Sequence, residues 1–235
     1  MKERKKQTFL LLPVMLVFWL SCNSNKQAET TNSLDFTAIQ DKFKYENLKQ
    51  FSLDTLGWGK KRFDLYKHLD SNSFVKIYQD TTERFEESGG MGNADYFYSK
   101  QKSKRNLIEL TLLVQREGDY IDRIEYFIYT KGGKKISSFV VASGGGDGGY
   151  YETAEGKFLN DSTYLLSRED NYDGSELDQQ GESITRSEIK TIIKQDGTIF
   201  QTTRIVKKET KNPPPVNDTI VNEMEHIVKN DSTLN

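Results

Sequence analysis

The chain has 235 residues, with 33 Lys and Arg against 35 Asp and Glu, for a formal net charge of −2. This slightly acidic balance argues against nucleic-acid binding, which requires clustered cations to neutralise phosphates. The single cysteine, Cys22, excludes an intrachain disulfide, so stability has to come from packing.

The N-terminus combines a basic head with a short apolar run that ends just before Cys22. Residues 8–20 are apolar but too few to span a bilayer comfortably, which favours an export signal over a membrane anchor. The pair Ser21-Cys22 resembles the lipobox of bacterial lipoproteins. This resemblance implies that residues 1–21 are a signal peptide and that Cys22 carries fatty acyl chains such as palmitate. We therefore expect a lipid anchor in the bacterial cell envelope.

Residues 22–33 are small and polar, as expected of a tether between the lipid and a folded domain. Within them, residues 23–27 lack the acidic run that resembles a surface-export signal in Bacteroidota. This favours the periplasmic face of the outer membrane over display at the cell surface.

Five triplets consist of Asp, then Ser or Thr, then an aliphatic residue or Thr. They resemble the O-glycosylation motif of exported Bacteroidota proteins, which would make their central hydroxyls acceptors. The alternative is that these pairs start turns, because both side chains bond to nearby backbone groups. The five central residues are Thr55, Thr81, Ser162, Thr219 and Ser232.

The chain from residue 34 to residue 212 is predicted to form one β-rich domain. Loosely helical apolar spacing predicts a short helix within residues 34–50, and residues 74–79 are predicted to be a strand. From about residue 106, turn signals recur and the segments between them alternate, as in half-buried strands. Asp196-Gly197 predicts a tight hairpin. We expect about eight strands in an antiparallel meander that forms a curled sheet or an up-and-down barrel.

A tail begins at the three prolines of residues 213–215, which cannot donate to a sheet. After them, Ile220, Met224 and Ile227 fall on one helical face, and Asp218 could cap it. Residues 213–235 are therefore interpreted as a tail that either forms a short docking helix or is frayed.

Catalytic and cofactor signals are weak. His68 and His226 are far apart in sequence, and no serine lies in a nucleophile elbow, so no catalytic residue and no cofactor is assigned. The glycine-rich run of residues 143–149 lacks the Lys-Ser/Thr of a phosphate loop. It is better interpreted as a hairpin connection.

Two acidic groups remain as candidates. Glu169, Asn171 and Asp173 resemble the first three ligands of an EF-hand calcium loop, but Gln180 replaces the bidentate glutamate, which leaves a weak calcium site or a solvated loop. Asp147, Glu152 and Glu155 lie near one turn, and glycosidases use two such carboxylates.

Residues 136–149, with the segments that follow, resemble uncharacterised β-rich lipoproteins of Bacteroidota, a resemblance that implies no known chemistry. We expect an envelope-anchored, non-enzymatic binding or assembly module with a protein or glycan partner. A hydrolase using paired carboxylates and a lipid carrier with an apolar lumen are the alternatives.

Overall fold

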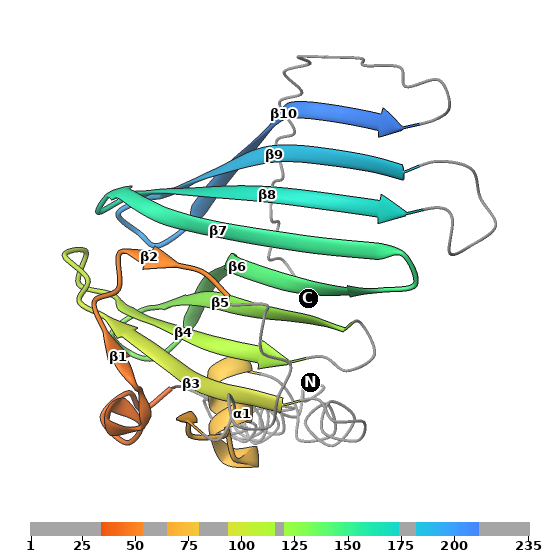
Figure 1. The fold of residues 1–235 in the computed structure, drawn as a ribbon. Helices are drawn as coiled ribbons and strands as arrows, with labels where there is room; N and C mark the ends of the chain where they lie inside the picture. The colour runs from red at the N-terminus through yellow and green to blue at the C-terminus, as the bar shows by residue number, and fades with distance from the viewer. Residues whose placement is uncertain (1–33, 54–64, 80–93, 116–119, 174–181, 212–235) are drawn as a thin grey trace, which may run out of the picture. The chain divides into compact units, whose positions relative to one another are not determined.

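The computed structural model describes residues 34–53, 65–79, 94–115, 120–173 and 182–211. They form one mixed sheet of ten strands, of which all the long ones are antiparallel, together with one α-helix (Figure 1). The sheet order is β1-β3-β4-β5-β6-β7-β8-β9-β10, and β2 pairs with β7 beside this path. The predicted antiparallel meander is confirmed.

Two of the strands are very short, namely β1 (Tyr45–Glu46) and β2 (Gln50–Phe51). The long ones are β3 (Ala94–Gln101), β4 (Ile108–Gln115), β5 (Ile121–Tyr129), β6 (Lys135–Asp147), β7 (Tyr150–Asn160), β8 (Thr163–Asp173), β9 (Glu182–Ile193) and β10 (Ile199–Lys211).

The sheet is open, so of the two predicted architectures it is the curled sheet and not the closed barrel. The ladder between β6 and β7 is short, because only residues 143–147 of β6 pair with residues 150–154 of β7. Beyond this point the edge of β7 pairs with β2, at Lys157 and Gly156. Strand β2 thus occupies the place that β6 leaves.

Two apolar clusters hold the domain together. One joins the inward residues of β4–β6 to those of β7–β9, with Tyr126, Phe139 and Tyr164 among them. The other lies between β3–β5, the helix and the segment that precedes β1. Strand β4 touches both clusters, through Leu113 and Leu110, and is buried along all but its last residue.

Two of the predicted elements are wrong. The expected helix in residues 34–50 is only a 3₁₀ turn, η1 (Gln40–Lys42), followed by β1. The expected strand at residues 74–79 belongs to an α-helix, α1 (Ser71–Tyr78). Asp70 caps this helix, since its Oδ1 accepts from the Ser73 N–H at 2.8 Å.

The sequence pattern does not predict strand β3, because clear apolar alternation starts only near residue 106. On its buried face Phe97 lies between Asp95 and Ser99, so two of three buried positions are polar. This mixture hides the alternating apolar pattern by which half-buried strands are recognised.

The predicted hairpin turn at Asp196-Gly197 is confirmed. Gly197 adopts a φ of +87° in the hairpin between β9 and β10, as the Asp196-Gly197 pair predicted. The glycine-rich run is partly a paired strand: a Cβ on Gly146 would lie 1.9 Å from the carbonyl oxygen of Tyr150. Close backbone approach therefore explains that glycine.

The predicted signal peptide, the predicted tether and the predicted proline-started tail lie outside the described residues. Among the helices that the structure describes, none is long and apolar enough to cross a membrane.

Candidate functional site

A cluster of charged and hydroxyl side chains forms where β6, β7 and β8 pair. Glu152 of β7 lies opposite Asp170 of β8, and Arg168 lies two residues before Asp170 on the same face. Ser143 of β6 lies opposite Ala154, the cross-strand neighbour of Arg168. Strand alternation and register thus place side chains from three strands on one patch.

The guanidinium of Arg168 is the centre of this Arg168 cluster. Its Nη2 donates to Glu152 Oε2 at 2.9 Å and to Asp170 Oδ1 at 2.8 Å, and its Nε also donates to Asp170 at 2.9 Å. The hydroxyl of Tyr150 donates to Asp170 at 2.6 Å and to Glu152 at 3.1 Å. Ser143 Oγ donates to the other oxygen of Glu152. Glu152 is buried, whereas the Arg168 side chain is 34% exposed.

The protonation states in the cluster follow from its geometry. Burial, together with the hydrogen bond to Asp170, raises the pKa of Tyr150 to about 12, so the phenol remains a neutral donor. Burial opposes the charge on Arg168, but the hydrogen bonds to Asp170 and the charge of Glu152 raise its pKa above the ordinary value. Arg168 is therefore a fixed cation whose orientation is set by three neighbours.

A hollow of about 430 Å³ lies beside this cluster, within the size range of small-ligand pockets. Strands β6 to β10 line it, together with Ser52 and Leu53, which follow β2. Five charged residues border it, namely Arg168, Arg186, Glu155, Glu169 and Glu188, but strand alternation and register place the last four on the opposite face of the sheet from Arg168. Its hydroxyl-bearing residues are Ser52, Ser143, Thr153, Ser167 and Ser187.

One nitrogen of Arg168 remains available in this hollow. Nε and Nη2 make all the hydrogen bonds of Arg168 with the described residues, and Nη1 makes none. Because Arg168 lines the hollow and is one-third exposed, Nη1 can donate to a bound molecule there.

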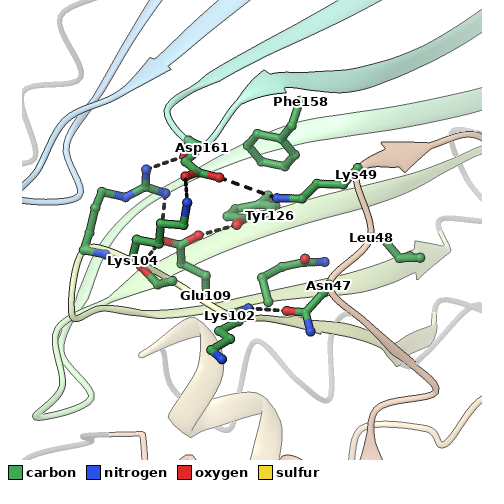
Figure 2. A pocket seen from close by; sticks show the side chains of 12 residues that line it. Asn47, Leu48, Lys49, Lys102, Lys104, Glu109, Tyr126, Phe158 and Asp161 are labelled. Carbon is green, nitrogen blue, oxygen red and sulfur yellow. Dashed lines mark hydrogen bonds and ion pairs between the residues drawn. The ribbon is translucent and has the colours of Figure 1, made fainter.

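A second polar cluster lies where the β3–β4 connection packs against Glu109 of β4 and Tyr126 of β5 (Figure 2). Glu109 accepts from Tyr126, from Ser103 at 2.6 Å and from Arg105 Nη2 at 2.8 Å. Burial and the charge of Glu109 raise the pKa of Tyr126 well above its ordinary value. The side chains of Arg105 and Glu109 are 6% and 3% exposed, so this is a buried ion pair.

The cavity at this second cluster is small. Lys104 and Lys49 form ion pairs with the carboxylate of Asp161, at 2.6 and 3.7 Å, and all three residues line the cavity (Figure 2). The cavity measures about 30 Å³, which is room for about one water molecule. We interpret it as a structural junction, because a ligand does not fit.

The structure separates the three carboxylates that the sequence grouped. Glu152 belongs to the Arg168 cluster. Asp147 accepts from the Gly148 N–H in the β6–β7 turn. Glu155 is exposed and, three positions from Glu152, points to the opposite face of β7. The carboxylate that lies opposite Glu152 is that of Asp170 on β8.

The calcium candidates Glu169, Asn171 and Asp173 occupy alternate positions of β8 and are not in a loop. Glu169 accepts from Arg186 Nε at 2.7 Å. Among the described residues, no three His, Cys, Asp or Glu side chains gather as a metal site would require. Gln180 lies outside the described residues.

Of the five predicted glycosylation sites, the described residues include Ser162 alone. It lies in the tight turn between β7 and β8, and its hydroxyl is 3.0 Å from Asn160 Oδ1. The structure therefore agrees with a turn-forming role for this triplet. Thr55, Thr81, Thr219 and Ser232 lie outside the described residues, as does the lipidation candidate Cys22.

Sequence reasoning did not assign Arg168, Asp170 or Ser143 to a site, and it considered Tyr150 only as an aromatic ring that could stack on a sugar. The spacing of Arg168 and Asp170 places them on one strand face, but nothing local shows that Glu152 lies opposite. Comparison of the chain with protein-family models, with curated proteins and with solved structures found no match.

Proposed function

We propose that this chain is a lipid-anchored binding module of the bacterial cell envelope that holds an uncharged carbohydrate in the hollow beside Arg168. The anchor is Cys22, and residues 22–33 connect it to the sheet. The observation that carries the proposal is the hollow of about 430 Å³ bordered by Arg168, whose Nη1 makes no hydrogen bond with the described residues.

The composition of the hollow favours a neutral ligand with many hydroxyls. Arginine nitrogens donate, carboxylates accept, and serine and threonine hydroxyls do both. A sugar can pair with all three kinds of group. Since the Arg168 cluster pairs one arginine with two carboxylates, Glu152 and Asp170, an anionic ligand gains no net attraction there.

Preorganisation supports binding at this place. Glu152, Asp170 and Tyr150 hold the guanidinium before any ligand arrives, so little side-chain entropy is lost when Nη1 donates.

The two alternatives are less well supported. A glycosidase needs one carboxyl group as an acid and another as a base or nucleophile, whereas Glu152 and Asp170 are tied together by Arg168 and Tyr150. A lipid carrier needs a large enclosed lumen, whereas this hollow is open to solvent and is bordered by the charged Arg168.

The test is a thermal-shift screen of the full chain carrying Cys22→Ala. The probes are maltotriose, cellotriose and tri-N-acetylchitotriose, with trigalacturonate as the acidic and palmitate as the lipid comparison. A neutral trisaccharide should raise the midpoint, because a ligand that binds only the folded state stabilises it. Arg168→Lys should abolish the shift, whereas Lys100→Arg, at the ion pair with Glu46 near the other edge of the sheet, should not.

No shift with any neutral trisaccharide, or a shift that Arg168→Lys leaves intact, would contradict the proposal. A shift with palmitate alone would support the lipid carrier. The anchor is tested separately: Cys22→Ala should move the chain from the membrane fraction to the soluble periplasmic fraction.

A further inference from the structure

The two edges of the sheet differ in their backbone pairing. At the β3 edge, β1 pairs with Ser99 and Lys100, and the Leu69 N–H donates to the carbonyl oxygen of Asp95 at 2.8 Å. At the other edge, β10 pairs with β9 on one side, and no described strand pairs with its second side.

The hairpin geometry shows which groups of β10 point to this open side. The Lys194 N–H donates to the carbonyl oxygen of Thr198 at 2.8 Å, which makes these two residues a hydrogen-bonded pair. Antiparallel pairs alternate between bonded and non-bonded, so the next pair, Ile193 with Ile199, is non-bonded. The backbone groups of Ile199, Gln201, Thr203 and Ile205 therefore face away from β9.

These four residues are placed symmetrically about Thr202. A second copy of β10, related by a two-fold axis through Thr202 and running antiparallel, would bring Ile199 opposite Ile205 and Gln201 opposite Thr203. Every outward backbone donor between residues 199 and 205 would then meet an outward acceptor of the other copy, and the reverse. We propose that this edge of β10 binds the same edge of a second copy of the chain.

The side chains are compatible with this register. Ile199 and Ile205 would pair on one face, and Gln201 would lie beside Thr203. On the other face Phe200 would lie opposite Arg204, an arrangement that allows a cation–π contact. A register centred on Arg204 would instead place two arginines opposite one another, which is destabilising.

The far part of β10 limits the contact to this segment. The β9–β10 register shifts between Ile205 and Lys207, and the exposed Lys208 follows. A bulge and lysines are the features by which natural sheets block edge pairing. The preceding seven residues lack both, and Arg204 is their only charged side chain.

The test is disulfide trapping at residue 202. In the proposed register, Thr202 faces its own counterpart in a non-hydrogen-bonded pair, at a Cα separation of about 4.5 Å. This separation lies within the range that a disulfide spans. The full chain carrying Cys22→Ser and Thr202→Cys should therefore become a covalent dimer on mild oxidation, seen on a non-reducing gel.

Two variants keep the test sharp. Lys190→Cys lies directly opposite Thr202 on β9, one strand further from the axis, and should remain monomeric. Thr203→Pro removes an outward N–H and leaves the bonds to β9 in place, so in the Thr202→Cys chain it should reduce trapping to the Lys190→Cys level. Its thermal midpoint should stay close to that of the Thr202→Cys chain.

A Thr202→Cys chain that stays monomeric with a free thiol would overturn the proposal. So would trapping that is equal in Lys190→Cys, or trapping that persists in a folded Thr203→Pro variant. The sugar-binding proposal stands or falls independently, because none of residues 199–205 lines the hollow.

Discussion

The two halves of the sheet are built from strands of similar kind but are buried very differently. Strands β3–β5 lie between two apolar clusters, and β4 is buried along nearly its whole length. Strand β9, in the other half, is fully buried at only three of its positions, Ser187, Thr191 and Ile193. The half formed by β3–β5 therefore supplies much of the core, whereas the half that contains β9 carries a polar surface.

Helix α1 accounts for this difference in burial between the two halves. It covers one face of β3–β5 through Phe74 and Ile77, so β4 is buried on both faces. No described element gives β8 and β9 a comparable second layer, and charged residues are consecutive in β8, at 168–170, and alternate in β9, at Arg186, Glu188 and Lys190. The hollow and the Arg168 cluster lie in this second half, where polar side chains remain solvated.

The largest expected effect is in the doubly covered half. Phe127 is fully buried and contacts Tyr78 edge-on, with ring centroids 5.4 Å apart. Phe127→Ala should reduce the free energy of unfolding by about 3–5 kcal/mol, measured by urea denaturation, because it leaves a cavity in a packed core. Phe200→Ala on half-buried β10 should cost far less. Equal losses of unfolding free energy in the two variants would contradict the difference in burial between the two halves.

The next largest effect is the difference in stability cost between removing a charge from a buried ion pair and removing one from an exposed ion pair. Glu109→Gln should destabilise the chain by about 2–3 kcal/mol, since Arg105 and Tyr126 lose their buried acceptor charge. The matched change Glu209→Gln affects ion pairs with Arg186 and Lys207 whose side chains are about half exposed, and should cost less than about 1 kcal/mol. Urea denaturation of both variants measures the difference. A Glu109→Gln variant as stable as the parent would contradict the assigned buried pair.

In the polar half the expected effect is on binding more than on stability. Arg168→Lys should weaken the bound trisaccharide at least about tenfold, or about 1.4 kcal/mol, because a lysine cannot bond to Glu152 and Asp170 and still donate to the ligand. Calorimetric titration measures the affinity, and thermal unfolding verifies the fold. A loss of folding without a specific loss of binding would place Arg168 among the structural residues.

The smallest effect is a pH dependence at the start of α1. Partial burial opposes ionisation of Asp70, but hydrogen bonds from the Ser73 N–H and from Lys42 lower its pKa from 3.8 to about 2. Because the folded value is depressed, this stabilisation is present above pH 4 and lost as the pH falls toward 2. Asp70 is largely exposed, so the contribution should be below about 1 kcal/mol.

The variant Asp70→Asn keeps a good N-cap and should flatten the stability profile between pH 4 and pH 2. Urea denaturation at several pH values measures it. An unchanged profile would show that the Asp70 ionisation does not contribute.

The fold was predictable where the signal is local. Alternation along β4 and the Asp196-Gly197 turn determine strands and a hairpin from neighbouring residues alone. The strand prediction for residues 74–79 is wrong because the Asp70 cap lies before that segment and because the spacing of Phe74 and Ile77 within it is helical.

The site was predictable only in part, because it depends on register. Glu152 was named from its nearness to a turn, but its partners Arg168 and Asp170 come from the next strand. A shift of one residue between β7 and β8 would send them to the opposite face.

The most direct test of the account is an NMR titration of the full chain carrying Cys22→Ala with whichever neutral trisaccharide raises its thermal midpoint. The account predicts that amide shifts concentrate on Ser143, Ala154, Arg168 and Ser187, which line the hollow. Shifts centred on Lys104 and Asp161 at the small cavity, or no shifts at all, would contradict it.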